Sequence, residues 1–403
     1  MSTSLLYHAF GIKGYQYVRT HYSEGKVVFS IKKEPTSLRC PCCKDWHVIR
    51  HGETLRWFQT IPIGKRQVYI SLPVPRVECR RCNIVRQISI GFAEERRTFT
   101  TTFERYALEL SRHMTILDVA RHLNVSWDIV KDIQKRHLTK RYGRPHLQGI
   151  ELIAIDEISI GRGHRYLTVV IDLHTGAVVF VGDGKGADAL LPFWKRLQKA
   201  KATIRAVAMD MSPSYISAVS NQLPGATIVF DHFHIIKMFN DKLSELRRDL
   251  QRNAQEAEKQ IFKGTRWLLL KNPENLKEER QEKEHLEKAL QLNKPLSTAY
   301  YLKEDLRQLW SQKSKDKATS FLDDWIAKAK GSEIKILKDF AGTLDRHRDG
   351  ILAYYDYPIS TGPLEGTNNK IKTMQKQAYG FRDMDFFKLK IYALHEAKYA
   401  LVG

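Results

Sequence analysis

Three acidic residues, spread over more than half of the chain, are the side chains best suited to chemistry: Asp156, Asp210 and Glu365. The two aspartates end short strand-like runs, LIAIDE and RAVAMD, and the glutamate opens a helical stretch, PLEGTNNKIK. Carboxylates at two strand ends and on a distant helix can converge on one point and hold a pair of divalent cations. One cation then activates the attacking oxygen of a phosphodiester reaction and the other stabilises the leaving oxygen. The pattern predicts metal-dependent phosphodiester chemistry, with all three carboxylates as ligands.

The second ligand has an alternative, because aspartates at strand ends also serve as turn formers. Asp172, Asp183 and Asp231 occupy places similar to that of Asp210. Asp231 is the main alternative, since it stands three residues before His234. We expect Asp231 and His234 to shape the site or contact DNA rather than to bind the cation.

The helix that carries Glu365 has two further polar residues at helical spacing. Asn368 and Lys372 follow at i+3 and i+7 and so lie on the same helix face. A carboxylate, an amide and an ammonium group in one line suit a metal beside a phosphate backbone, so we expect Asn368 and Lys372 to contact DNA. A capped helix with a polar face is the alternative interpretation.

All five cysteines lie in a short part of the chain: Cys40, Cys42, Cys43, Cys79 and Cys82. Two pairs on two turns supply four thiolates for a tetrahedral structural zinc ion. The expected ligands are Cys40, Cys43, Cys79 and Cys82, although Cys42 could replace Cys43. Disulfides are not expected, because we expect the protein to be cytoplasmic.

The stretch TILDVARHLNVSWDIVKDIQKRHL, residues 115–138, predicts two helices joined by a turn. Its first half has one apolar face, Asn124 and Val125 form the turn, and Ser126 is a good N-cap for the second helix. This is a helix-turn-helix, whose second helix can enter a major groove; an ordinary helical hairpin is the alternative. Four residues on the outer side of that helix are expected to contact DNA, the basic ones through phosphates: Trp127, Lys131, Lys135 and Arg136.

The charge of the chain is unevenly distributed. The formal net charge is +21, and residues 1–150 hold 26 Lys and Arg against 12 Asp and Glu. Such an excess suits a polyanionic partner that the N-terminal part engages first, although a generally basic surface would also produce it. The sequence has no signal-peptide pattern and no apolar run of membrane-spanning length, which predicts a cytoplasmic protein without membrane contact.

The remaining patterns predict a multidomain α+β protein. Residues 1–92 alternate like short strands and are expected to form a zinc-ribbon-like DNA-binding module, with the helix-turn-helix in residues 93–148. Three strands with turns at 161–164 and 174–176 precede a helix–strand–helix–strand series, the order of a ribonuclease-H-like α/β core. We assign that catalytic domain to residues 149–235 and 351–403. Residues 236–350, with apolar-periodic stretches such as 259–272, are expected to form a long all-helical insertion.

Taken together, these motifs resemble those of bacterial insertion-sequence transposases of the DDE class, in the ISL-three group. The resemblance covers nearly the whole chain and rests on CPxC…CxxC, VARHLNVSWDIVKDI, IAIDE, VAMDMSPSY, VFDHFHIIK, PLEGTNNKIK and AYGFRD. It implies that Asp156, Asp210 and Glu365 are the DDE triad of a ribonuclease-H-like fold. Glu365 and Lys372 match half of an E-x6-K signature, but the preceding tyrosine and arginine of that signature are absent. Thr361 stands where family members often have asparagine before glycine.

The resemblance also implies a reaction. The N-terminal region would bind the terminal inverted repeats of an insertion sequence, and the catalytic domain would cleave one strand at each end to free a 3′-hydroxyl. That hydroxyl would attack target DNA in a transesterification that uses two Mg²⁺ or Mn²⁺ ions and neither ATP nor a covalent protein intermediate. A structural Zn²⁺, a homodimer or larger assembly on DNA, and a nucleoid-associated protein in the bacterial cytoplasm are further expectations.

Two other functions remain open at the level of sequence. One is a non-catalytic DNA-binding regulator derived from a transposase, which the presence of all three acidic residues disfavours. The other is a ribonuclease-H-like, structure-specific DNA nuclease that cuts without strand transfer. A helix-turn-helix and a zinc module fit sequence-specific binding of DNA ends better than they fit such a nuclease.

Overall fold

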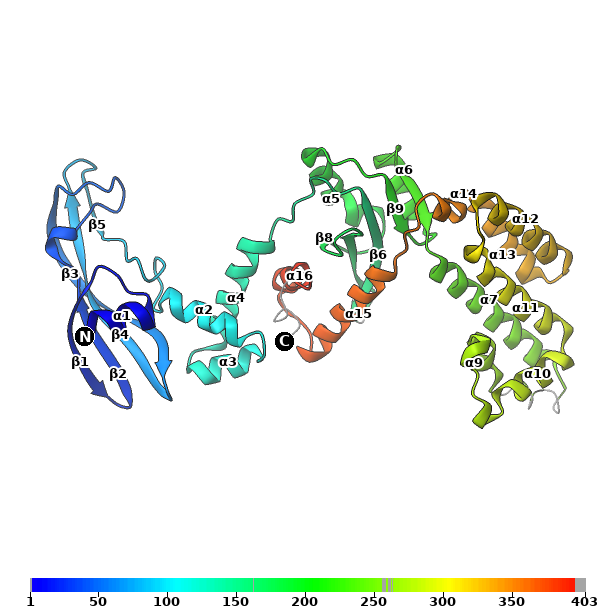
Figure 1. The fold of residues 1–403 in the computed structure, drawn as a ribbon, viewed down its shortest axis with the longest axis horizontal. Coiled ribbons are helices and arrows are strands. Elements are labelled where there is room, and N and C mark those ends of the chain that lie inside the picture. The colour runs from blue at the N-terminus through cyan, green and yellow to red at the C-terminus, as the bar shows by residue number, and fades with distance from the viewer. Residues whose placement is uncertain (1, 162, 256–258, 260–261, 263, 396–403) are drawn as a thin grey trace. The chain divides into compact units, whose positions relative to one another are not determined.

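In the computed structural model, the described residues are 2–161, 163–255, 259, 262 and 264–395. They form two compact units, one from residues 2–143 and 374–390 and the other from residues 144–373 and 391–395 (Figure 1). Some predicted segments lie partly outside the described residues: residue 162 of the turn at 161–164, residues 260, 261 and 263 of the stretch 259–272, and residues 396–403. No helix in the described ranges has the length and apolarity to cross a bilayer.

The first unit contains a five-stranded sheet and an N-terminal helix that the sequence analysis did not predict, α1 (Ser2–Phe10). The strands are β1 (Gln16–Ser23), β2 (Lys26–Lys32), β3 (Val48–Ile63), β4 (Arg66–Cys79) and β5 (Ile84–Gln87), with a 3-10 turn, η1 (Pro35–Ser37), after β2. Their order is β1-β2-β4-β3, with β5 also on β4; β2 and β4 run parallel, and the other pairs are antiparallel. Alternate β4 side chains are buried, as a one-sided strand requires: Val68, Ile70, Leu72 and Val74.

The predicted helix pair is present in the same unit. Helix α2 (Thr101–Leu110) is followed by α3 (Ile116–Leu123) and α4 (Trp127–Tyr142). The hydroxyls of Thr115 and Ser126 accept hydrogen bonds from backbone N–H groups in the first turns of α3 and α4, and Asn124 adopts a left-handed conformation with φ 50°. These caps and this turn residue set the angle between the two helices.

The second unit is organised around another five-stranded sheet, with the order β10-β9-β6-β7-β8. The strands are β6 (Leu152–Gly161), β7 (Arg165–Asp172), β8 (Val178–Asp183), β9 (Ala206–Met209) and β10 (Thr227–Phe230). The first three form an antiparallel meander, while β9 runs parallel to β6 and β10 runs parallel to β9. Helices α5 (Ala187–Ala200) and α6 (Pro213–Gln222) connect the strands and share their core. The predicted order of elements is confirmed.

The described part of the predicted insertion is helical, and its core is continuous with that of the sheet. Helix α7 starts at His232, immediately after the sheet, so helical structure begins earlier than residue 236. The α-helices are α7 (His232–Asn253), α9 (Thr265–Leu270), α10 (Glu282–Leu292), α11 (Lys294–Arg307), α12 (Lys315–Gly331), α13 (Lys335–Arg346) and α14 (Arg348–Leu352). The 3-10 turns are η2 (Pro273–Asn275), η3 (Glu278–Arg280), η4 (Gln308–Ser311) and η5 (Ala353–Tyr355).

Two helices close the described chain, α15 (Gly362–Gln377) and α16 (Met384–Tyr392). On α15 the buried positions recur at helical spacing and mix apolar with polar side chains: Leu364, Thr367, Asn368 and Ile371. Glu365 lies beside this buried stripe and is exposed. The helix therefore packs through one face and leaves its acidic residue accessible.

Candidate active site

The carboxyl ends of three parallel strands place three aspartates near one another. Asp210 follows β9 directly, and Asp231 follows β10 directly, as predicted. Asp156 does not end its strand, contrary to the sequence expectation, because β6 continues to Gly161 through its pairing with β7. The parallel pairing of β6 with β9 nevertheless stops at Ala154. Asp156 thus lies just beyond the last residue of β6 that pairs with β9.

One pocket of about 560 Å³ collects the three predicted carboxylates. Asp156 comes from β6, Asp210 follows β9, and Glu365 comes from the first turn of α15. Its lining also contains His234, Asn368 and Lys372 from the sequence analysis. Six residues that the sequence analysis had not assigned to the site complete the lining: Glu157, Ser159, Tyr166, Phe233, Lys237 and Asn369.

Asn368 fixes Asp156 in this pocket. Its Nδ2 donates a hydrogen bond to Asp156 Oδ2 at 2.9 Å, and the Glu157 backbone N–H donates to Asp156 Oδ1 at 2.7 Å. Burial raises the pKa of Asp156 above its ordinary value; the charges of Asp210 and Glu157 act in the same direction, while the Glu157 N–H and His234 oppose it. Burial and acidic neighbours make it costly to ionise this carboxyl group. A bound cation would stabilise its ionised form.

A second observation indicates that the pocket suits a divalent cation. Asn368 is buried, and its Oδ1 atom has no hydrogen-bond partner within the described part of the chain. Buried acceptors that lack a partner are rare, because leaving one unsatisfied costs free energy. Carboxylates and an amide oxygen together form the hard donor set that Mg²⁺ and Mn²⁺ prefer.

Asp231 is placed differently from Asp210. Its side chain is only 1% exposed and does not line the pocket. The Oδ2 atom accepts hydrogen bonds from the Thr361 hydroxyl at 2.6 Å and from His234 Nδ1 at 3.0 Å. Burial alone would raise the pKa of Asp231, but the bonds from His234 and Thr361 outweigh it, and the pKa lies below its ordinary value. The same bond to Asp231 raises the pKa of His234.

Glu157 has a partner that the sequence analysis missed. The Tyr215 hydroxyl lies 3.4 Å from Glu157 Oε2 and 3.0 Å from the Thr168 hydroxyl. Burial raises the pKa of Tyr215 to about 12, so the phenol stays protonated and can donate. Tyr215 and Lys237 end the motifs VAMDMSPSY and VFDHFHIIK, but the sequence analysis assigned neither residue a role, although Lys237 stands one helical turn after His234.

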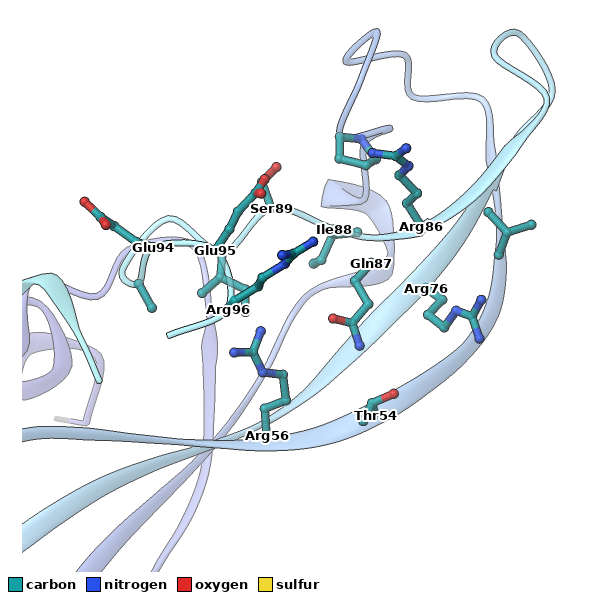
Figure 2. Close-up of a pocket in the computed structure, with 14 residues that line it drawn as sticks. Thr54, Arg56, Arg76, Arg86, Gln87, Ile88, Ser89, Glu94, Glu95 and Arg96 are labelled. Atoms are coloured by element: carbon teal, nitrogen blue, oxygen red, sulfur yellow. The ribbon is translucent and has the colours of Figure 1, made fainter. Parts of the chain in front are cut away.

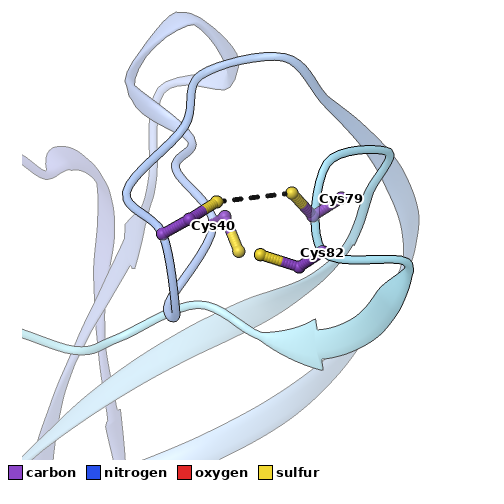
Figure 3. Close-up of side chains that lie close together, drawn as sticks. Cys40, Cys79 and Cys82 are labelled. Carbon is purple, nitrogen blue, oxygen red and sulfur yellow. Dashed lines mark hydrogen bonds between the residues drawn. The ribbon is translucent and has the colours of Figure 1, made fainter.

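The four predicted zinc ligands converge in the first unit. The sulfurs of Cys40, Cys43, Cys79 and Cys82 lie within 4.8 Å of one another (Figure 3). The backbone N–H of Cys43 lowers the pKa of Cys40 to about 6, whereas the thiol of Cys43 raises the pKa of Cys82 to about 12. Cys42 is exposed and outside the cluster. The residues present fit a structural zinc ion.

The predicted DNA-contacting residues of α4 are engaged within the first unit. Lys131 and Lys135 both pair with Asp383, at 3.1 and 3.0 Å. Arg136 contacts Glu94, Glu104 and Asp132. Trp127 is exposed, and the Lys131 ammonium lies 5.2 Å from the centre of its ring. Acidic neighbours therefore partly neutralise the basic charges of this helix face.

Known protein families and known transposases match most of the chain. Residues 153–391 match a family described as transposase, and residues 88–138 match the helix-turn-helix domain of transposase family ISL3. The transposase for insertion sequence element IS1001 of Bordetella parapertussis is 32% identical over 391 residues, which cover 95% of this chain and 96% of that protein. The transposase for insertion sequence element IS1557 of Mycobacterium tuberculosis is 28% identical over 371 residues, which cover 85% of this chain and 82% of that protein.

Among solved structures, the Drosophila P element transposase strand transfer complex aligns with a TM-score of 0.39 and 12% identity, covering 76% of this chain and 94% of that chain. The sequence matches carry the assignment. The transposase profile spans more than half of the chain, and the match to the IS1001 protein runs along nearly its whole length. This chain belongs to transposase family ISL3 and is a DNA transposase, an enzyme that cleaves DNA and transfers its strands.

Proposed function

We propose that Asp156, Asp210 and Glu365 form the catalytic triad of this transposase and bind two divalent cations, Mg²⁺ or Mn²⁺. The observation that carries this proposal is the single pocket that these carboxylates share, although they come from two strands and a helix far apart in sequence. When bound, the cations would activate the attacking oxygen and stabilise the leaving oxygen of a phosphodiester.

The catalytic domain is proposed to have a ribonuclease-H-like fold, formed by residues 149–235 and 351–403 and interrupted by the insertion at 236–350. The antiparallel meander followed by two parallel strands, with the order β10-β9-β6-β7-β8, supports this assignment. Asp210 follows β9 directly, and Asp156 lies just beyond the last residue of β6 that pairs with β9, so both aspartates lie at one edge of the parallel part of the sheet.

The surrounding side chains have separable roles in the proposal. Asn368 orients Asp156 through its hydrogen bond. Lys237 and Lys372 bring positive charge to the same pocket, where they would hold the phosphate groups of the DNA strand being cut. Asp231 acts through His234 and Thr361, which it holds in place from beneath the pocket. We assign Asp231 a structural role and Asp210 the role of second cation ligand.

The first unit is proposed to recognise the terminal inverted repeats of the element. The zinc-binding module of residues 1–92 and the helix-turn-helix of residues 93–148 would bind each end, with Trp127 the most accessible of the four predicted residues on α4. Cleavage would free 3′-hydroxyls that attack target DNA directly, without ATP. Two ends must be joined together, so we propose a homodimer or larger assembly on DNA, in the nucleoid of a bacterial cytoplasm.

A transposition assay in cells tests the function, with the DNA that flanks the gene as substrate. We expect wild-type protein to excise and integrate the marked element and Glu365→Gln to be inactive, because the substitution keeps the shape of the side chain but removes its charge. Glu284→Gln, at an exposed position on α10, is the matched control and should retain activity. Equal activity of wild type and Glu365→Gln would refute the triad. End binding without movement by the wild type would favour a regulator.

A further inference from the structure

A second large pocket, of about 630 Å³, lies in the first unit and is lined by four arginines. Arg56 comes from β3, Arg76 from β4, Arg86 from β5, and Arg96 from the loop that precedes α2 (Figure 2). Neither the sequence motifs nor the proposed active site accounts for these residues. Their collection from four separate segments indicates that the fold, rather than local sequence, builds the pocket.

The charge of this arginine pocket is largely uncompensated. Arg76, Arg86 and Arg96 are exposed, and no ion pair to them occurs within the described residues. Arg56 donates a hydrogen bond to the backbone carbonyl of Arg97 at 2.7 Å, which orients the guanidinium without neutralising it. Since like charges repel at close range, the pocket would gain free energy by binding an anion.

Acidic residues do not cancel this charge. Glu94 and Glu95 also line the pocket, but the carboxylate of Glu94 is bound by Arg136. In Figure 2, Glu94 points away from the arginines, whereas Glu95 lies beside Arg96. One acidic side chain therefore faces four guanidinium groups, and the lining as a whole stays positive.

The geometry suits phosphate oxygens. Thr54 and Arg56 are two residues apart on β3 and so share one face of the sheet. Arg76 lies directly opposite Gln87 in the pairing of β4 with β5, and both line the pocket. Guanidinium forks, an amide and a hydroxyl are the donors that proteins use to bind phosphate groups, and an arginine can bind two oxygens at once.

The cysteine cluster borders the arginine pocket. Strand β4 ends at Cys79, β5 begins two residues after Cys82, and Pro41 beside Cys40 lies on the pocket wall. A metal ion that joins these two cysteine turns would fix β5, and with it Arg86 and Gln87, relative to β4. The cysteine cluster would then position anion-binding side chains in addition to stabilising a small domain.

We propose that the arginine pocket binds backbone phosphates of double-stranded DNA and gives the N-terminal module a contact that does not depend on base sequence. The proposal rests on the proposed function only in taking DNA as the ligand of this module, and it is independent of the catalytic triad. Phosphate contacts of this kind fix the position of a protein on the duplex and make its affinity depend on salt.

Fluorescence anisotropy with full-length protein tests the proposal, in buffer without Mg²⁺ so that no cleavage occurs. The probes are a labelled duplex from the DNA flanking the gene and a labelled duplex of unrelated sequence. The variant Arg76→Gln/Arg86→Gln is compared with Arg19→Gln/Arg66→Gln, which removes the same charge from exposed positions of the same sheet outside the pocket. We expect the pocket variant, but not the control, to make the slope of log affinity against log salt shallower by about 1–2 on both duplexes.

Equal slopes for the two double variants would overturn the proposal, since only overall charge would then matter. A loss confined to the flanking-DNA duplex would also overturn it, because the arginines would then read bases. If Arg76→Gln/Arg86→Gln loses zinc or secondary structure, Arg96→Gln in the loop replaces it, with Arg96→Lys expected to restore part of the slope. All of these outcomes are binding measurements without Mg²⁺ at residues outside the active-site pocket, so an error in the proposed triad would leave them unchanged.

Discussion

The amide of Asn368 on α15 donates a hydrogen bond to the carboxylate of Asp156 on β6, across 212 residues of sequence. This bond joins the helix that carries Glu365 to the strand that carries the first proposed ligand. Mutation of a group that orients a metal ligand typically costs about 10- to 100-fold in metal affinity or activity. The alignment of the proposed triad therefore depends on a neutral side chain as well as on its three acids.

The Asn368 bond predicts a loss of activity without a loss of DNA binding. Replacing Asn368 with alanine should lower the rate of end cleavage by about 10- to 100-fold and raise the Mg²⁺ concentration needed for half-maximal rate. Cleavage of labelled end DNA at several Mg²⁺ concentrations measures both quantities. Asn221→Ala, at an exposed position of α6 outside the pocket, is the control. An unchanged Mg²⁺ requirement in Asn368→Ala would argue against an orienting role.

The two candidate second ligands should separate by mutation. Asp210→Asn should reduce the rate of cleavage by more than about 100-fold, which is a larger loss than a residue that only orients a ligand would cause. The stability of this variant should change little. Asp231→Asn should instead lower the free energy of unfolding by about 1–3 kcal/mol, because a buried hydrogen-bonded carboxylate is disturbed. Cleavage assays and denaturant unfolding of both variants distinguish them. The opposite pattern would make Asp231 the ligand.

The bond between His234 and Asp231 predicts a pH-dependent stability. The pKa of folded His234 is raised above the ordinary value of about 6.5, chiefly by Asp231. The protonated imidazole therefore stabilises the folded state. This contribution is complete below about pH 6.5 and is lost as the pH rises through the folded-state pKa of His234. His234→Gln should destabilise the protein by about 1–2 kcal/mol near pH 6 and by less near pH 9.

Denaturant unfolding without added Mg²⁺ at both pH values checks this prediction. His174→Gln, at an exposed histidine in the turn after β7, controls for the general loss of an imidazole. A loss in His234→Gln that is the same at both pH values would show that packing, and not the charged hydrogen bond, accounts for the effect.

The cysteine cluster predicts which thiols hold zinc. Cys82→Ser should lower the zinc content from about one ion per chain toward none after dialysis, because a structural site needs all four ligands. Cys42→Ser should keep its zinc, since Cys42 lies outside the cluster. Elemental analysis measures the content, and thermal unfolding should show a less stable Cys82→Ser protein. Zinc loss in Cys42→Ser would mean that Cys42 replaces Cys43.

Local patterns were enough to predict the elements that hold the site. Ser126 predicts a helix start through its capping hydroxyl, and the paired cysteines predict a metal site through their spacing alone. These features depend on residues close together in sequence. The same reasoning placed Asp210 and Glu365 correctly at a strand end and a helix start.

Features that depend on tertiary pairing could not be predicted. Asp156 was expected to end its strand, but β7 continues to pair with β6 beyond it. Lys131 and Lys135 had been assigned to DNA, and nothing near them in sequence indicates that Asp383 binds both. The arginine pocket could not be predicted either, because its four arginines come from three strands and a loop and follow no local spacing.

The helical insertion leaves the sheet and returns to it beside the same strand. Helix α7 starts directly after β10, and at the other end Ala353 packs against Val229 of β10. Gly350 of α14 lies so close to Phe230 that an added Cβ would stand 2.4 Å from its ring. Segments whose ends meet can change length during evolution without altering the register of the strands around them. The insertion can thus change in length without shifting the strands of the sheet, provided that it still covers Phe230 at the end of β10.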